Sequence, residues 1–194
     1  MTDHSPRSDA LAWVAGSDAP EQNVLDLGFM PLADAAPLIV AATQGFAQPY
    51  GLTLNLRRQP SWASLRDKLL CGELDPAQML YGQVYGIHLG LGGPATPMAI
   101  LMGLNQNGQS ITLGNALREA GVTDGEALRA RTHQGGARLT LAHTFPTGTH
   151  AMWLYYWLAS HGIHPLRDLD CVVVPPAQMV AHLRAGRIYG FCAG

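Results

Sequence analysis

Short apolar strands alternate with capped helices along this chain, and this alternation constrains its fold more than any other feature. Leu25–Phe29 is short and apolar, and Leu52–Leu56 alternates apolar and polar residues as a half-buried strand does. A helix is predicted over Trp62–Leu70, with Ser61 as its N-cap and Gly72 at its end. Strands that are each followed by a helix predict an α/β lobe with a largely parallel sheet.

Three more elements are expected in this first part. Asp34 could cap a helix that ends near Gly45. Met79–Gly90 is predicted to be a helix, and the apolar run Pro97–Leu104 a strand.

The same alternation returns after Asn105. Strands are predicted at Ser110–Leu113, Leu139–His143, Cys171–Val174 and Ile188–Cys192, and helices from Thr112 or Asn115, at His150–His161 and at Ala177–Ala185, with a polar loop at Gly121–Gly136. We therefore expect an N-terminal tail over residues 1–24, a first α/β lobe over 25–104 and a second over 105–194. A strand at the very end of the sequence indicates a fragment whose first lobe is incomplete.

Composition excludes several classes of protein. Hydrophobic residues make up 47% of the 194 residues and charged residues 13%, which argues against disorder. The net charge of −2 argues against direct binding of nucleic acid, which needs a basic surface. The longest apolar stretch, Leu32–Ala42, contains Asp34 and Pro37 and is too short to cross a bilayer, so no membrane insertion is expected.

The N-terminus and the cysteines suggest a compartment. Met1–Gln22 has no basic segment leading into an apolar one, which predicts the absence of a secretory signal and a cytoplasmic location. Cys71, Cys171 and Cys192 form no CxxC pair, and we expect buried free thiols rather than a metal or redox site.

The first candidate site is the start of the Trp62 helix. Its backbone N–H groups and positive dipole end would point outward, and Trp62 adds an aromatic wall with an indole N–H donor. An ordinary serine cap beside a core tryptophan explains the same pattern.

The second candidate is the turn before the His150 helix. Pro146 and Gly148 turn the chain into a helix at Thr149, which creates another N-terminus rich in donors and suited to an anion. His150, in the first turn, is expected to be a neutral N–H donor rather than a catalytic base. A threonine cap with a satisfied histidine remains the alternative.

The third candidate is Gln109, in the polar segment between the two halves. Its amide could bind an anion, or the segment is simply a polar hinge. Two helix N-termini, a tryptophan and an amide in one cleft would form a receptor for a small flat anion. Enzyme motifs such as GxSxG and HExxH are absent from the sequence, so we expect no catalysis, no metal and no cofactor.

Five segments also resemble a known family, in the family's order. They read LGFMPLADAAPLIVAATQGF, SWASLRDKLLCGELDPAQML, LNQNGQSITLGN, FPTGTHAMWLYYWLASHGI and VVVPPAQMVAHLRAGRIYGFCAG. They are similar to the nitrate/bicarbonate-binding proteins of ABC transporters, and still more to the cytoplasmic nitrate sensors of that family. The likeness covers about Leu25 to Gly194.

The resemblance implies a periplasmic-binding-protein-like fold of type II, with the ligand held in a cleft between two α/β lobes. The family's ligand positions fall on Trp62, Gln109 and His150, with Gly148 and Thr149 beside them. Bicarbonate-binding relatives tend to carry glutamine at the position of His150, so nitrate or nitrite is favoured. A further ligand position, a lysine or an acid, is expected after Gly194.

The resulting prediction is reversible binding of nitrate or nitrite by a cytoplasmic sensor that controls an RNA-binding transcription antiterminator of nitrate assimilation. The alternative is the substrate-binding component of a nitrate or bicarbonate ABC transporter, which would work with an ABC permease in the periplasm.

Overall fold

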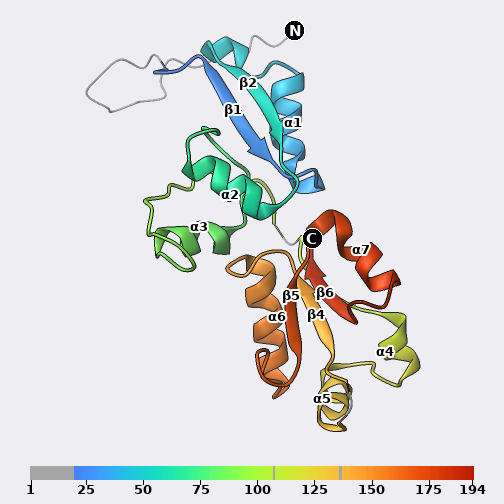
Figure 1. Cartoon of the computed structure of the whole chain (residues 1–194). Coiled ribbons are helices and arrows are strands. Elements are labelled where there is room, and N and C mark those ends of the chain that lie inside the picture. Colours follow the sequence, from blue (N-terminus) through green and yellow to red (C-terminus); the bar gives the residue numbers. More distant parts are fainter. Residues whose placement is uncertain (1–19, 107, 136) are drawn as a thin grey trace.

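The computed structural model describes residues 20–106, 108–135 and 137–194, and their elements form two groups that meet near the middle of the molecule (Figure 1). One group contains β1, β2 and α1–α3, and the other contains the remaining strands and helices. The C-terminal residue lies where the two groups meet.

The first group is built on a small parallel sheet. β1 (Val24–Phe29) pairs in parallel with β2 (Thr53–Arg58). α1 (Ala36–Thr43) joins the two strands, and α2 (Trp62–Leu70) follows the second. α3 (Tyr81–His88) completes this group.

The second group has a four-stranded mixed sheet in the order β3-β6-β4-β5. Its strands are β3 (Ser110–Leu113), β4 (Thr140–His143), β5 (Asp170–Val173) and β6 (Gly190–Ala193), and its helices are α4 (Asn115–Glu119), α5 (Gly125–His133), α6 (Thr149–Ser160) and α7 (Pro176–Arg184). β4 is parallel to both β5 and β6, whereas β3 is antiparallel to β6. The right side of the sheet in Figure 1 carries α7 and the left side carries α6.

β4 is the central buried strand of the second group. Leu141 joins the larger core cluster with Leu154 and Leu158 of α6, while Ala142 joins a separate cluster with Met179 of α7. Both strand residues are fully buried, because helices cover both faces of the sheet. β4 therefore holds the residues that follow it in a fixed position.

Most elements lie close to their predicted positions, and four predictions are wrong. Pro97–Leu104 is not a strand, because it pairs with neither β1 nor β2. The segment Gly121–Gly136 contains α5, which begins where the Asp124 carboxylate accepts the N–H of Ala127 at 2.8 Å.

The other two errors concern a helix cap and the cysteines. Asp34 lies inside a short 3₁₀ turn, Ala33–Ala35, and caps nothing; the N-cap of α1 is Ala35. Cys71 is exposed rather than buried, whereas Cys192 is buried and Cys171 is half-buried. Within the ranges given above, no helix is long and apolar enough to span a membrane.

Candidate functional site

The start of α2 is as the sequence predicts. The Ser61 hydroxyl accepts the backbone N–H of Ser64 at 3.1 Å and caps the helix. Trp62 is 1% exposed and belongs to a cluster with Met30, Leu65, Leu80 and Phe145. Trp62 is therefore a core residue, so the structural alternative for this position is correct as far as packing goes.

Packing leaves the indole N–H of Trp62 unaccounted for. Its Nε1 is buried, and no group in the described part of the chain accepts its hydrogen. A buried donor without an acceptor costs about 1–3 kcal/mol. An anion could accept this hydrogen. Packing of the ring in the core does not explain why the N–H lacks an acceptor.

Phe145 joins the two groups of elements. It follows β4 in the second group, yet its ring packs in the Trp62 cluster of the first group. The guanidinium carbon of Arg66, one turn along α2, lies 5.4 Å from the centre of the ring. Arg66 also pairs with Asp67 at 2.7 Å, so its charge is partly neutralised. Sequence reasoning identified neither contact, because both depend on how the two groups meet.

Gly148 and Thr149 also lie where the two groups of elements meet, the region that we call the junction. A β-carbon added to Gly148 would come within 2.8 Å of Leu80 Cδ1 and 3.3 Å of Phe145 Cβ. Trp62 and Gly148 therefore share two neighbours. Thr149 Oγ1 accepts the backbone N–H of Gly82 in α3 at 3.5 Å.

α6 begins at Thr149, as predicted, and its start offers donors without the threonine cap of the structural alternative. Gly148, not Thr149, is the N-cap, and no side chain caps the helix. Within the described residues, the backbone N–H groups of Thr149 and His150 make no hydrogen bond. Together with the positive end of the helix dipole, these groups favour an anion at this position.

His150 is 5% exposed, and its Nδ1 lies 2.9 Å from the Thr144 hydroxyl oxygen. Burial lowers the pKa of His150, and the negative charge of Asp34 opposes that effect in part. The ring is therefore neutral at pH 7, as expected of a donor. A β-carbon on Gly194 would come within 3.7 Å of His150 Nε2 and 2.8 Å of the Gly108 carbonyl oxygen, so Nε2 points toward the place where the chain passes between the two groups.

Gln109 lies apart from the Trp62 cluster. It is exposed and lines a hollow of about 360 Å³ beside α6, together with Trp153, Tyr156 and Trp157. Its backbone neighbour Gly108 lies beside Gly194, and thus near His150. Gln109 therefore lies at the edge of the junction, in a hollow that it shares with residues of α6.

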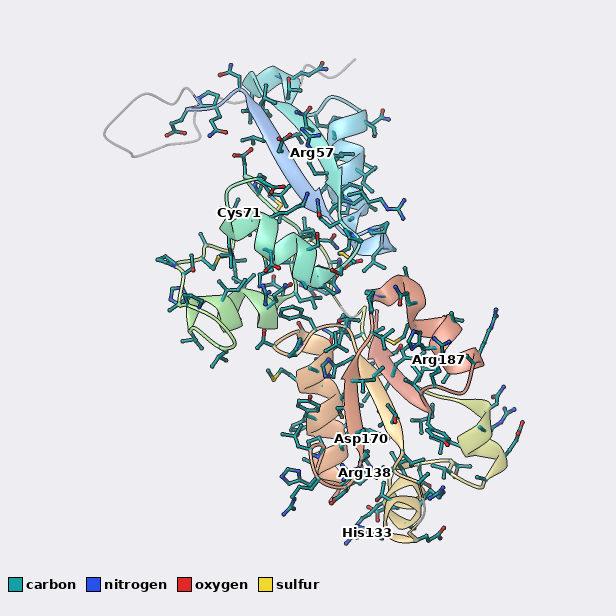
Figure 2. All side chains as sticks on the ribbon, in the orientation of Figure 1. Arg57, Cys71, His133, Arg138, Asp170 and Arg187 are labelled. Atoms are coloured by element: carbon teal, nitrogen blue, oxygen red, sulfur yellow. The ribbon has the colours of Figure 1, made fainter. Side chains whose placement is uncertain are left out.

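Two other arginines form ion pairs away from the junction. Arg57 bonds to Asp26 at 2.9 Å and Arg138 bonds to Asp170 at 3.0 Å. Figure 2 shows Arg57 along β2 and Arg138 beside Asp170, at the end of the second sheet that is remote from the junction. The described residues contain no cluster of His, Cys, Asp and Glu that could hold a metal ion. The chemistry available at the junction is hydrogen-bond donation to an anion.

The chain is similar to proteins of a known family. Residues 18–194 match the model of the NMT1-like family. The chain is 43% identical over 192 residues to a nitrate/nitrite binding protein, NrtA, of Synechocystis sp. PCC 6803; the match covers 93% of this chain and 42% of that protein. It is 39% identical over 171 residues to a bicarbonate transport ATP-binding protein, CmpC, of the same organism, covering 87% of this chain and 26% of the other.

A solved structure is similar as well. The crystal structure of the periplasmic nitrate-binding protein NrtA from Synechocystis PCC 6803 has a TM-score of 0.83 and 42% identity, and the match covers 91% of this chain and 48% of that one. The periplasmic-binding-protein-like α/β fold is thereby confirmed. The chain spans less than half the length of these relatives.

Proposed function

The chain belongs to the NMT1-like family, and from this premise we propose that it binds nitrate or nitrite reversibly as the substrate-binding component of an ABC-type importer. One observation carries the choice of ligand class. The Trp62 indole N–H is buried without an acceptor, in the cluster that joins the two groups of elements. A site that presents ring and backbone N–H donors suits an anion whose exposed atoms are all acceptors.

The proposed ligands are Trp62, His150 and the first turn of α6 at Gly148 and Thr149, with Gln109 at the edge. We also propose that the lobes divide near residues 104 and 105, so that the ligand lies between them. No catalytic step is proposed, and the named relatives are binding and transport proteins.

Bicarbonate is the second candidate ligand, because a relative with 39% identity is named a bicarbonate transport ATP-binding protein. Bicarbonate brings an O–H hydrogen that needs an acceptor. Neither the Trp62 indole nor the backbone N–H groups of α6 can accept it. This difference favours nitrate.

Import is better supported than the sensing role predicted from the sequence, because the relatives compared above are named for binding and transport and one is periplasmic. The same comparison supports a periplasmic location over the predicted cytoplasmic one. An ABC permease and ATP-binding subunit are the partners that this proposal implies. Control of an RNA-binding antiterminator stays a prediction of the sequence.

Gene deletion distinguishes the two roles. Under the import proposal, cells without this gene lose nitrate uptake at low external nitrate while transcription of the assimilation genes keeps its response to nitrate. A sensor would give the opposite result, with uptake intact and transcription no longer responding. Calorimetric titration with nitrate, nitrite, bicarbonate and chloride tests the ligand separately. Saturable binding of bicarbonate but not of nitrate would contradict the choice made here.

A further inference from the structure

The end of β4 presents a buried hydroxyl to the histidine of the candidate site. Thr144 directly follows β4 and is 3% exposed, and its Oγ1 lies 2.9 Å from His150 Nδ1. Both faces of β4 are packed against helices, so the position of Thr144 is set by the core rather than by a loop. This is the only hydrogen bond of the Thr144 hydroxyl within the described residues.

The direction of this hydrogen bond follows from counting hydrogens. A threonine hydroxyl has one hydrogen to donate, and a neutral imidazole has one N–H. If Nδ1–H donated to Thr144, the hydroxyl hydrogen would be buried without an acceptor, at a cost of about 1–3 kcal/mol. If the hydroxyl donates to Nδ1, its hydrogen is satisfied and the ring hydrogen lies on Nε2.

The charge state of the ring supports the same arrangement. Burial lowers the pKa of His150, so the neutral ring with a single N–H dominates at pH 7. Asp34 is the charged group that acts on His150, and its carboxylate raises the pKa; His143, whose own pKa is lowered by burial and by His150, is neutral. His150 Nε2 makes no hydrogen bond within the part of the chain that the structure describes.

We propose that Thr144 is a positioning residue of the anion site, whose hydroxyl donates to His150 Nδ1 and thereby keeps the ring hydrogen on Nε2, directed at the ligand. The proposal deepens the proposed function and rests on it. The opposite tautomer would present a lone pair to the anion and repel it. Thr144 thus selects for ligands that accept a hydrogen bond, without touching them.

The first test needs no substitution and no ligand. The chain is labelled with ¹⁵N-histidine, and a long-range ¹H–¹⁵N spectrum at pH 7 separates the protonated from the unprotonated nitrogen of each ring. We expect His150 to carry its hydrogen on Nε2. A hydrogen on Nδ1, or a doubly protonated ring at this pH, would overturn the proposal.

Three variants then test the cause. Thr144→Val keeps the shape of the side chain and removes the hydroxyl, Thr144→Ser keeps the hydroxyl, and Thr140→Val makes the same change in β4 at a residue whose side chain forms no hydrogen bond within the described ranges. We expect Thr144→Val to shift His150 toward the Nδ1–H tautomer and to weaken nitrate binding about tenfold, equivalent to about 1.4 kcal/mol. Thr144→Ser and Thr140→Val should match the parent in both measurements.

The two readouts separate the proposal from the function on which it rests. An unchanged His150 tautomer in Thr144→Val would overturn the role of Thr144, whatever the affinity. If all variants show the expected tautomers but the parent does not bind nitrate saturably, the Thr144–His150 arrangement is supported. The proposed function is then contradicted. Should Thr144→Val fail to fold, the spectrum of the parent and the rescue by Thr144→Ser still decide.

Discussion

Gly86 of α3 lies so close to Thr147, in the turn before α6, that a β-carbon added to Gly86 would come within 2.6 Å of Thr147 Oγ1. Gly82 lies one turn earlier on the same helix face, and a β-carbon added to it would come within 2.5 Å of the Thr147 carbonyl oxygen. Two glycines at this spacing let α3 approach the backbone of the second group. The contact packs α3 of the first group against the turn that precedes α6, the helix that carries His150.

Adding a methyl group at Gly82 should disturb this contact. Because the clash is with backbone, the two groups must shift, and overpacking of this kind costs about 1–3 kcal/mol. The gain in helix propensity from glycine to alanine, about 1 kcal/mol, offsets part of the loss. Urea unfolding of Gly82→Ala should therefore show a net loss of up to about 2 kcal/mol. Gly93→Ala is the matched control, because a β-carbon there meets nothing within 4 Å; equal stability of the two variants would contradict the close approach.

Truncating Phe145 should weaken the junction further. Phe145 is 7% exposed and packs with Trp62 and Leu80, so Phe145→Ala should lower the free energy of unfolding by about 3 kcal/mol. Phe46, which is 62% exposed, provides the control, and Phe46→Ala should change stability by less than about 0.5 kcal/mol. Similar losses in thermal unfolding of both variants would show that Phe145 is not a core residue in solution.

The junction also marks the limit of what the sequence could predict. Ser61 and Gly72 defined α2 because capping is local, and the predicted range Trp62–Leu70 agrees with the structure. The strand predicted at Pro97–Leu104 was wrong because a strand needs a partner, which an apolar run does not specify. α5 was missed because only Leu128 and Gly125 are buried along it, so it has no apolar periodicity; the cap Asp124 was the available signal.

The local features of the candidate site could be predicted from the sequence, and its tertiary contacts could not. Helix N-termini and ring donors can be identified along the sequence, and Trp62 and His150 were found by that means. The pairing of Thr144 with His150 and the packing of Phe145 across the two groups depend on tertiary structure. The hollow that Gln109 shares with Trp153 of α6 depends on tertiary structure as well, and the sequence did not predict it.

Stability should depend on pH through His143. Burial lowers the pKa of His143 to about 4 from its ordinary value of 6.5, and its Nε2 lies 3.1 Å from the Tyr155 hydroxyl. Between pH 6.5 and 4 the unfolded chain binds the proton that the folded chain excludes, so the free energy of unfolding falls as the pH is lowered through this range. The loss is about 3 kcal/mol, and the lowered pKa of His150 adds to it in the same direction.

Two substitutions test this pH dependence. His143→Gln removes the titrating group and keeps an acceptor for Tyr155, so urea unfolding at pH 7 and pH 4.5 should give a smaller difference than in the parent. His133, at the end of α5 in Figure 2, is exposed, and His133→Gln should change the difference by less than His143→Gln does. A parent chain equally stable at both pH values would contradict the burial of a neutral His143.

Removing single ring donors should weaken nitrate binding. Trp62→Phe retains an aromatic ring but loses the indole N–H, and His150→Ala loses the Nε2 donor; each should cost about 1–3 kcal/mol of binding free energy by calorimetry. Gln109→Ala should act in the same direction. Trp153→Phe is the control, because Trp153 is 55% exposed on the outer face of α6. Unchanged affinity in both Trp62→Phe and His150→Ala would make these two residues structural only.

The most direct measurement is a nitrate titration of the ¹⁵N-labelled chain followed by NMR, with sodium chloride added in parallel to hold ionic strength equal. We predict that the Trp62 indole N–H and the His150 ring nitrogens shift along a single saturation curve, which chloride does not reproduce. Because a Kd of about 1 mM corresponds to only about −4 kcal/mol, the titration should extend to roughly 100 mM. Shifts of Trp62 and His150 with different midpoints, or no saturable shift over that range, would contradict a shared anion site between the two groups of elements.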